Sequence, residues 1–509
     1  MQLKDFETFF DDGRKFSVSD ETLQLIEKSH RFLTDFSKDK IIYGINTGFG
    51  PMAQYKISPE DQQQLQYNLV RSHATGQGPK LENHYVRAIM LCRINTLSLG
   101  HSGVSIGVIK QLEAYIQNNI CPVIPEHGSV GASGDLVQLA HLALGLIGEG
   151  KCSYKGELRP VESVLKELDI APLKLSLRDG LALINGTSGM SGIGMINLLQ
   201  ASNLISWATL MGAIINELVE AYDDSFSEEL NRVKKHRGQN QIAAAMRHSL
   251  KDSKRIRKRE EHLFQTDRHG DVIPNKEKVQ EYYSFRCIPQ VLGPVYDGIA
   301  NAKKILEEEI SSANDNPIID LEKQNVFHGG NFHGDYIAYE MDKLKIGITK
   351  LSILCERQLN YLMNHQLNDR FPPFMNLGKL GFNFGIQGVQ FTATSTTAEN
   401  QTLSFPMSVH SIPNNNDNQD VVSMGSNAAL ITAKVIDNAF QVLAIEAVAI
   451  AQAIDYIDEH EKLSTNTLKF HKMIRKFVEI IKDDRYLAED IEELKTHLVE
   501  TKSFSSIDF

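Results

Sequence analysis

Apolar residues recur every three or four positions through long stretches of the middle of the chain. This spacing is the period of an α-helix with one apolar face. The clearest examples are Leu351, Leu354, Cys355, Leu359 and Leu362, and the ranges 297–310, 335–362 and 421–453. Phe371-Pro372-Pro373 is expected to end the helix over 335–362, because proline lacks an amide donor and restricts the residue before it. Long helices packed side by side form a bundle, so we predict a mostly α fold.

The chain is expected to divide into three parts in sequence order. Residues 1–195 mix short helical runs with loops punctuated by glycine and proline, and form an N-terminal domain. Residues 196–456 hold the long helices and form a central helical bundle. Residues 457–509 make a charged helical tail with too few apolar residues for a core of its own.

One uncharged stretch, 181–216, is longer than the roughly 20 residues that a membrane-spanning helix needs. Several asparagines interrupt it, among them Asn185, Asn197 and Asn203, and four glycines crowd its start. No pure apolar block with basic flanks remains. We therefore predict a buried helix of a large helical core and no membrane contact.

Composition and charge narrow the classes of function. The 509 residues are 42% apolar and 23% charged, as in ordinary folded domains. The 53 Lys and Arg against 64 Asp and Glu leave a net charge of −11, which argues against a nucleic-acid binder. A basic run at 234–237 and 254–259 is interleaved with acidic residues and is predicted to be a solvated helix face.

Neither the cysteines nor the N-terminus suggests a secreted or metal-binding protein. The five cysteines are widely separated and contain no Cys-x-x-Cys pair, so no metal site or disulfide framework is indicated. The first 20 residues lack the apolar segment of a signal peptide. A reducing, cytoplasmic location is predicted. The sequence motifs of nucleotide, zinc and serine-hydrolase sites are also absent.

The segment 128–136, GSVGASGDL, carries the most unusual chemistry. One interpretation is a glycine-rich turn in which Asp135 caps a helix over 136–147. In the other, a compressed turn lets the Gly134 amide nitrogen attack the Ala132 carbonyl carbon. Loss of two waters, one carrying the Ser133 hydroxyl, then leaves a ring with an electrophilic methylidene group.

Eight motifs in order resemble the ammonia-lyases that carry a 4-methylidene-imidazol-5-one (MIO) group, which act on histidine, phenylalanine or tyrosine. The resemblance covers about residues 5–505 and implies the fumarase/aspartase-like helical fold of that family. The motifs are 43–50 (YGINTGFG), Ser72-His73, 131–136 (GASGDL), 185–187 (NGT), 283–286 (YSFR), 315–317 (DNP), 330–333 (GNFH) and 418–420 (NQD).

The resemblance implies a role for each motif in removing ammonia from an α-amino acid. Ala132, Ser133 and Gly134 would form the MIO group autocatalytically, with no metal or nucleotide, and Tyr43 would be the catalytic base. The alternative for Tyr43 is a half-buried tyrosine in a glycine-rich loop. Asn185, with the Gly134 and Leu136 backbone, would polarise the ring carbonyl. The alternative for Asn185 is a cap of the following helix.

The remaining motif residues are implied to bind or flank the substrate. Arg286 would hold the carboxylate as a planar fork of donors, unless it forms a structural ion pair instead. Asn316 would add a second donor. Tyr283 and Gly50 would lie near the amine and the MIO group, Gln419 would support that group, and Phe332 would flank the substrate.

The pair Ser72-His73 is implied to select the substrate side chain. Histidine enzymes usually carry Ser-His, and Glu399 matches a carboxylate that can bind an imidazole N–H. Ser188 and Gln401, however, depart from the usual histidine-enzyme motifs, and 411–423 resembles the tyrosine-lyase version. Several stretches also resemble bacterial tyrosine ammonia-lyases of flexirubin-type pigment clusters, which keep Ser-His. His73 bonding a phenol, helped by Asn415 or Asn418, is physically sound, although His73 as a hydrogen-bonded core histidine is the alternative.

We therefore predict a cytoplasmic tyrosine ammonia-lyase that converts L-tyrosine to trans-4-coumarate and ammonia. Histidine ammonia-lyase, which gives urocanate, is the first alternative, and an MIO-dependent aminomutase is the second. A non-catalytic helical scaffold is a third alternative, from a different class. The family implies a homotetramer whose active sites draw residues from three chains.

Overall fold

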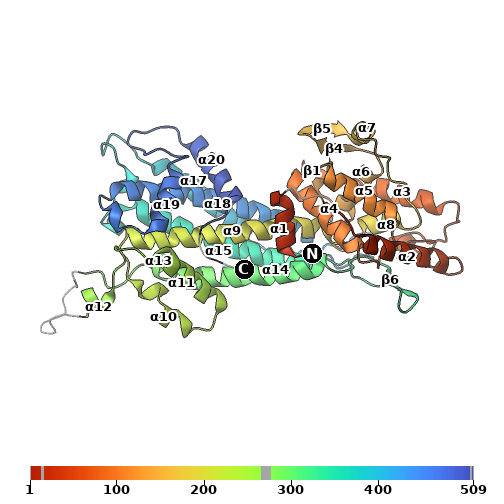
Figure 1. Ribbon diagram of the computed structural model, residues 1–509, viewed down its shortest axis with the longest axis horizontal. Helices are drawn as coiled ribbons and strands as arrows, with labels where there is room; N and C mark the ends of the chain where they lie inside the picture. The colour runs from red at the N-terminus through yellow and green to blue at the C-terminus, as the bar shows by residue number, and fades with distance from the viewer. Residues whose placement is uncertain (1, 13–15, 265–274, 276, 505–506, 508–509) are drawn as a thin grey trace. The chain divides into compact units, whose positions relative to one another are not determined.

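The computed structural model describes residues 2–12, 16–264, 275, 277–504 and 507 (Figure 1). The chain forms two compact units, each built from three segments. Unit 1 comprises Met1–Leu199, Ala302–Asp342 and Pro406–Ala433, and unit 2 comprises Gln200–Asn301, Lys343–Phe405 and Lys434–Phe509. The three-part division by sequence order remains a prediction, since these units interleave along the chain.

Four long helices contribute residues to both units, and they confirm the predicted mostly α fold. They are α9 (Ser188–Leu218), α14 (Ile288–Ile310), α15 (Asp335–Met363) and α18 (Gly425–Tyr456). Within each unit they lie alongside one another (Figure 1). In unit 1, Gly194 of α9 lies beside Leu306 and Met341. In unit 2, Gly212 of α9 lies beside Ile288 and Gln358.

The sequence predicted that the prolines at 372–373 end the helix over 335–362, but the helix ends before it reaches them. It ends at Met363. Asn364 has an extended backbone, and its side chain accepts a hydrogen bond from the Gln366 amide. A short helix, α16 (His365–Asn368), follows. An asparagine that bonds its own neighbouring backbone competes with the helix, so the break falls there.

The uncharged stretch is buried in α9, as predicted. α9 and α18 are long and apolar enough to span a membrane, but 78% and 67% of their most apolar windows are buried inside the protein. The asparagines of α9 bond to protein groups: Asn197 donates to the Ala429 carbonyl (2.8 Å) and Asn203 to the Leu498 carbonyl (2.8 Å). These contacts are typical of a helix buried in a helical core.

Unit 1 surrounds its share of the long helices with short helices and three small antiparallel sheets, ordered β1-β3, β2-β4-β5 and β6-β7. Its further helices are α1 (Leu3–Asp12), α2 (Asp20–Phe36), η1 (Gly50–Met52), α3 (Gln62–His73), α4 (Asn83–Leu97), α5 (Ile106–Gln117), α6 (Leu136–Leu146), α7 (Val161–Glu167) and α8 (Asp179–Ile184). Its strands are β1 (Gln77–Lys80), β2 (Cys121–Pro122), β3 (Pro125–His127), β4 (Lys151–Tyr154), β5 (Glu157–Pro160), β6 (Ile318–Asp320) and β7 (Asn325–Phe327).

Every helix or strand among the described residues of unit 2 is a helix, and loops join these helices. Besides its share of the long helices and α16, it holds η2 (Asp223–Phe226), α10 (Glu228–Arg232), α11 (Arg237–Ser249), α12 (Arg259–His262), α13 (Tyr283–Arg286), η3 (Pro373–Met375), α17 (Gln387–Leu403), η4 (His460–Lys462), α19 (Thr465–Ile474) and α20 (Ala488–Glu500). The 457–509 segment therefore is helical in part, as its pattern predicted.

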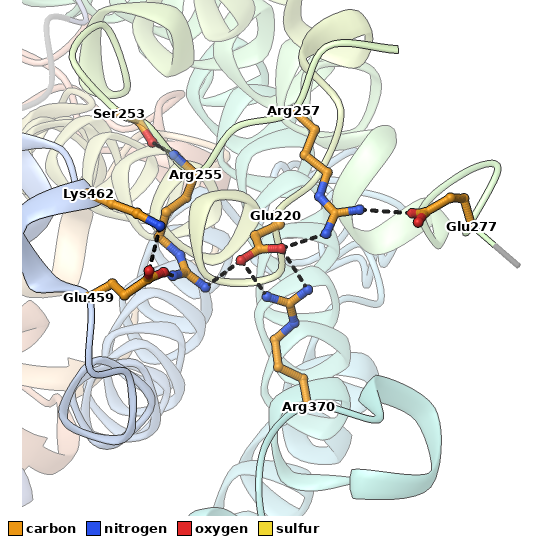
Figure 2. Close-up of polar contacts among 8 residues, drawn as sticks. All are labelled: Glu220, Ser253, Arg255, Arg257, Glu277, Arg370, Glu459 and Lys462. Carbon is orange, nitrogen blue, oxygen red and sulfur yellow. Dashed lines mark hydrogen bonds and ion pairs between the residues drawn. The ribbon is translucent and has the colours of Figure 1, made fainter. Parts of the chain in front are cut away.

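The basic run at 254–259 is not the solvated helix face that the sequence predicted. Only Arg259 lies in a helix, and Arg255 and Arg257 converge with Arg370 on Glu220 just beyond α9 (Figure 2). Arg255 is only 6% exposed and lies 2.7 Å from Glu220. Glu220, the acidic partner of this arginine, is distant in sequence, so the local charge pattern did not reveal the ion pair.

Glu220 is held as a carboxylate by its three arginines. Burial by itself raises the pKa of Glu220, but hydrogen bonds from Arg370 and Arg257 and the charges of Arg370 and Arg255 lower it to about 2. Arg255 and Arg257 lie in one segment, and Arg370 lies in another. The cluster thus joins the end of α9 to two segments that follow it.

A second buried carboxylate, Glu446 on α18, has a different environment. Its side chain is fully buried beside the Cys355 thiol of α15. Burial raises the pKa of Glu446 to about 8, while the hydrogen bond with Cys355 opposes the rise. Glu446 is therefore protonated at neutral pH, because no cation among its described neighbours balances a charge.

We predict that Glu220→Gln destabilises unit 2 by an amount on the order of 2 kcal/mol at pH 7, because three arginines lose their shared anion. Since the folded-state pKa lies below the ordinary 4.5, the contribution is present above pH 4.5 and disappears as the pH falls towards 2. Urea unfolding at several pH values measures it. Glu277→Gln, which removes the exposed partner of Arg257, is the control and should change stability little.

We predict that Glu446→Gln stabilises the protein at pH 8. Between pH 4.5 and about 8 the folded state keeps a proton that the unfolded state loses, so the parent's stability falls as the pH rises. The slope is at most about 1.4 kcal/mol per pH unit. Melting curves from pH 5 to 8 should show a widening gap between variant and parent. A constant gap, or the same widening in Asp437→Asn on the same helix, would contradict the assignment.

Candidate active site

The glycine-rich loop before α6 packs directly against another backbone segment. Gly134 has φ +72°, and a Cβ added there would lie 2.1 Å from the Gly186 carbonyl oxygen. The next amide, that of Asp135, donates to the same oxygen (2.8 Å). Only glycine permits both this dihedral angle and this close approach. The loop is thus fixed to the 185–187 motif by its backbone.

Asp135 does not cap the helix that it precedes, contrary to one interpretation of the sequence. Its buried carboxylate instead accepts the Met190 amide at the start of α9 (2.7 Å) and the Ser426 hydroxyl of α18 (2.5 Å). Burial raises the pKa of Asp135 to about 6, although the hydrogen bonds from Ser426, Met190 and Gly189 oppose the rise. Asp135 therefore ties the glycine-rich loop to two long helices.

Ser133 is contacted at both of its oxygen atoms. The Asn185 amide donates to the Ser133 carbonyl (2.9 Å), and the Gln419 amide donates to the Ser133 hydroxyl (2.9 Å). Asn185 also accepts the Asn316 backbone amide (2.9 Å). Asn185 is not the cap of α9, because it ends α8 and α9 begins three residues later. It links the glycine-rich loop to the 315–317 motif.

These contacts fit an imidazolone made from Ala132, Ser133 and Gly134. The Ser133 carbonyl would become the ring carbonyl, and the Asn185 donor already points at it. Gly134 would supply one ring nitrogen and Ser133 the other. Ala132 is only 4% exposed, so its carbonyl carbon is shielded from bulk water. The described residues contain no group of three or more His, Cys, Asp or Glu that could hold a metal ion.

One cavity of about 1310 Å³ in unit 1 is lined by most of the residues singled out from the sequence. They come from the loop after α2, from α3, from the glycine-rich loop, and from the loops before α9, β6, α15 and α18. They are Tyr43, Gly50, Ser72, His73, Ser133, Asn185, Asn316, Phe332, Asn415, Asn418 and Gln419. Gly134 lines an adjoining cavity of about 560 Å³ that shares His73, Ser133, Asn415 and Gln419.

Tyr43 is half-buried in the wall of this cavity. Its phenol oxygen accepts the Gly50 amide at 3.1 Å. Gly50 has φ +52°, and a Cβ there would lie 2.9 Å from the Asn415 side chain, so this turn also requires glycine. A hydrogen bond donated to the phenol oxygen favours its ionised form over its neutral form.

His73 lines the cavity, and its hydrogen-bond partners assign its tautomer. Its Nδ1 lies 2.9 Å from the Leu69 carbonyl and 3.1 Å from the Ser72 hydroxyl. Because a carbonyl only accepts, Nδ1 carries the hydrogen, and this assigns the tautomer in which Nε2 has the lone pair. A substrate O–H or N–H at this end of the cavity could therefore donate to Nε2.

Comparison with known proteins places the chain in a family. The sequence model of the family described as "Aromatic amino acid lyase" matches residues 1–476. The histidine ammonia-lyase of Staphylococcus saprophyticus is 38% identical over 501 residues, with 98% of this chain and 97% of that protein covered. The chain belongs to the aromatic amino acid lyase family. A carbon–nitrogen lyase activity follows from that membership.

Solved structures of similar proteins support the assignment of this lyase to the family. Tyrosine aminomutase from Streptomyces globisporus has a TM-score of 0.94 and 36% identity, with 98% of this chain and 95% of that one covered. Histidine ammonia-lyase from Trypanosoma cruzi has a TM-score of 0.87 and 31% identity, with 98% and 92% covered. The likeness extends over the whole chain, so the predicted family fold is confirmed.

Three residues singled out from the sequence belong to unit 2 of the lyase. The Arg286 guanidinium stacks on the Tyr283 ring, 4.6 Å from its centre, and its Nε is buried without a hydrogen-bond partner among the described residues. Arg286 lines a cavity of about 360 Å³ with Tyr222, Cys287 and Gln290. Glu399 of α17 accepts the Asn438 side-chain amide at 2.6 Å.

Several cavity residues of the lyase were missed by sequence reasoning. Leu69 and Leu65 line the wall one and two turns before His73 on α3, respectively, and helical spacing from His73 could have found them. His328 lines the cavity as well, and it precedes a motif that was recognised. Burial and the nearby Arg178 charge lower the pKa of His328. Arg178 itself carried no sequence signal.

We predict that Gly134→Ala prevents ring formation in the lyase, because the added methyl group collides with the Gly186 backbone. Intact-mass measurement should show the parent two waters lighter than its sequence, and the variant at its full sequence mass. Gly156→Ala is the matched control, since Gly156 has a similar φ of +81° with nothing within 4 Å. Ser133→Ala, which keeps the loop geometry, should also lack the deficit of two waters. A variant Gly134→Ala that retains the deficit would contradict the packing argument.

Proposed function

We propose that this lyase eliminates ammonia from L-tyrosine to give trans-4-coumarate. The observation that supports tyrosine is the acceptor nitrogen, Nε2, of His73, a residue that lines a cavity together with the apolar Leu65 and Leu69. A phenol O–H donates to such an acceptor, whereas phenylalanine would leave it unpaired. Asn415 and Asn418 line the same cavity and would add further polar contacts to the substrate.

Tyr43 is proposed to be the base that removes the β-proton. A free phenol has a pKa of about 10, so catalysis requires surroundings that favour the phenolate. The Gly50 amide is one such group, because it donates to the phenol oxygen. The β-proton would pass to the Tyr43 oxygen, and the phenol would then have to give it to the departing ammonia or to solvent before the next turnover.

Ala132, Ser133 and Gly134 are proposed to form the MIO group, which when formed supplies an electron-poor carbon that takes up the amine nitrogen and makes it a better leaving group. Asn185 would hold the ring carbonyl, and Gln419 would hold the side of the loop on which the Ser133 oxygen lies. These contacts orient the loop towards the cavity that Tyr43 also lines.

The substrate carboxylate is proposed to bind Arg286 and Asn316, with Phe332 and Tyr283 beside the substrate. Asn316 and Phe332 line the unit 1 cavity, while Arg286 and Tyr283 belong to unit 2. We propose a homotetramer in which neighbouring chains complete each site, as the family resemblance implies. A cytoplasmic location is proposed on the same basis.

Histidine is the second candidate substrate. The support for it is the 38% identity to a histidine ammonia-lyase, together with the carboxylate of Glu399, which could accept an imidazole N–H. A tyrosine aminomutase activity is a third candidate, since the tyrosine aminomutase of Streptomyces globisporus is 36% identical to this chain. The two lyase candidates and the aminomutase differ in product, so one assay separates them.

We predict that the purified protein converts L-tyrosine to a product with the long-wavelength absorbance of coumarate. If urocanate forms from L-histidine faster than coumarate forms from L-tyrosine, histidine is the substrate and the tyrosine proposal is wrong. A β-amino acid product would indicate the aminomutase. Turnover of neither amino acid would favour the non-catalytic scaffold.

We predict that His73→Phe lowers kcat/KM for tyrosine by about 10²-fold and raises it for phenylalanine, because the acceptor for the phenol is lost. Competition between the two substrates measures the change directly. Ser72→Ala is the control, since it keeps the imidazole and its bond to Leu69. An unchanged preference in His73→Phe would remove His73 from substrate selection.

A further inference from the structure

Arg178 is a fully buried cation in unit 1 to which neither the motifs nor the comparisons assign a role. Its side chain is 0% exposed and forms an ion pair with Asp315 (3.2 Å). A second nitrogen of its guanidinium donates to the Ser102 carbonyl. Arg178 immediately precedes α8, and Asp315 immediately precedes the cavity residue Asn316. An arginine buried this completely is held by partners on several segments.

The helix that Arg178 begins packs against the loop that carries Tyr43. A Cβ added to Gly44 would lie 2.2 Å from the Leu181 side chain, and Gly44 has φ +77°. Leu181 lies three residues after Arg178 and lines the same cavity as Tyr43. The start of α8 therefore lies behind the cavity wall at the position of Tyr43.

Arg178 interacts electrostatically with two residues of that wall. Burial lowers the pKa of the Arg178 guanidinium, and the charges of Asp315, Asp179 and Tyr43 oppose this. Arg178 in turn acts on His328. Tyr43 and His328 both line the cavity in which the substrate would bind.

The other charged groups around Arg178 are engaged elsewhere. Asp179 accepts the backbone amides of Ser105 (2.9 Å) and Ser176 (3.0 Å) and both of their hydroxyls. The buried Arg93, whose guanidinium also interacts with Asp315 and Arg178, donates to the carbonyls of Ala182 and Asn185. From the cavity side, the titratable groups that line the wall with Tyr43 are Tyr55, His73 and His328.

We propose that Arg178 is a positioning residue for Tyr43, whose buried guanidinium stabilises the ionised form of the phenol from behind the cavity wall. The inference rests on the proposed role of Tyr43 as the base. The phenol gives its proton to solvent before the substrate binds, and the phenolate then takes the β-proton. Asp315 limits the effect, because it neutralises part of the Arg178 charge.

The test measures kcat/KM against pH, with the amino acid that the substrate assay identifies, in the parent, Arg178→Lys and Arg178→Met. Removing the charge in Arg178→Met should move the acidic limb upward by about one pH unit, so that activity on that limb falls about tenfold and recovers at higher pH. Arg178→Lys should restore most of the parent profile. A uniform loss at every pH, with the limb unmoved, would show that Arg178 is only structural.

Two further measurements make the test specific. Arg93→Met removes a second buried arginine with carbonyl partners of the same kind, and it should leave the limb in place. The tyrosinate absorbance of each protein minus that of its Tyr43→Phe counterpart follows the Tyr43 phenol without turnover. Its midpoint should rise in Arg178→Met and fall in Asp315→Asn, and midpoints that do not move would overturn the inference.

Failure of the proposed function gives a different result. If Tyr43→Phe keeps full activity, Tyr43 is not the base, and the proposed function fails whatever Arg178 does. If Tyr43→Phe is inactive while the Arg178 variants leave both the limb and the absorbance midpoint unchanged, only the present inference fails.

Discussion

The contact between the Gly134 and Gly186 backbones is the constraint on which the rest of the site depends. It brings the glycine-rich loop to the segment that carries Asn185, whose side chain then bonds both Ser133 and Asn316. Gln419 reaches the same serine from a loop 286 residues away in sequence. The motifs at 131–136, 185–187 and 418–420 are far apart along the chain but meet at the tripeptide 132–134. The first two can approach this closely because neither Gly134 nor Gly186 has a side chain.

Buried charges in the two units are stabilised in different ways. In unit 1, Asp135, Arg178 and Asp315 lie behind the cavity, and their contacts fix loops and helix ends that form its wall. In unit 2, Glu220 is balanced by three arginines, whereas Glu446 has no such partner and keeps its proton. The pKa of a buried carboxyl group therefore follows from its local partners, and the degree of burial alone does not determine it.

Much of the fold could be predicted from the sequence, because long helices leave a periodic apolar pattern and α14, α15 and α18 appear where that pattern predicts them. The helix α9 appears in the uncharged stretch that was predicted to be a buried helix. The positions at which side chains meet over long sequence separations could not. The break at Asn364, the carboxylate of Asp135 on a different helix and the burial of Arg255 all depend on such tertiary contacts or on local side-chain bonding. The eight motifs identified the family and about half of the residues that line the cavity, but Arg178 and His328 carried no pattern of their own. The roles of the individual site residues remain predictions.

Different elements carry the two halves of the proposed chemistry. The tripeptide 132–134 is fixed by backbone packing against Gly186, while the wall at Leu65, Leu69 and His73 belongs to a single helix, α3. Side chains on the cavity-lining face of one helix can be exchanged without disturbing a backbone contact elsewhere. An ancestral protein of this architecture could therefore have changed the amino acid it accepts by altering one face of α3, while the machinery that breaks the carbon–nitrogen bond stayed intact.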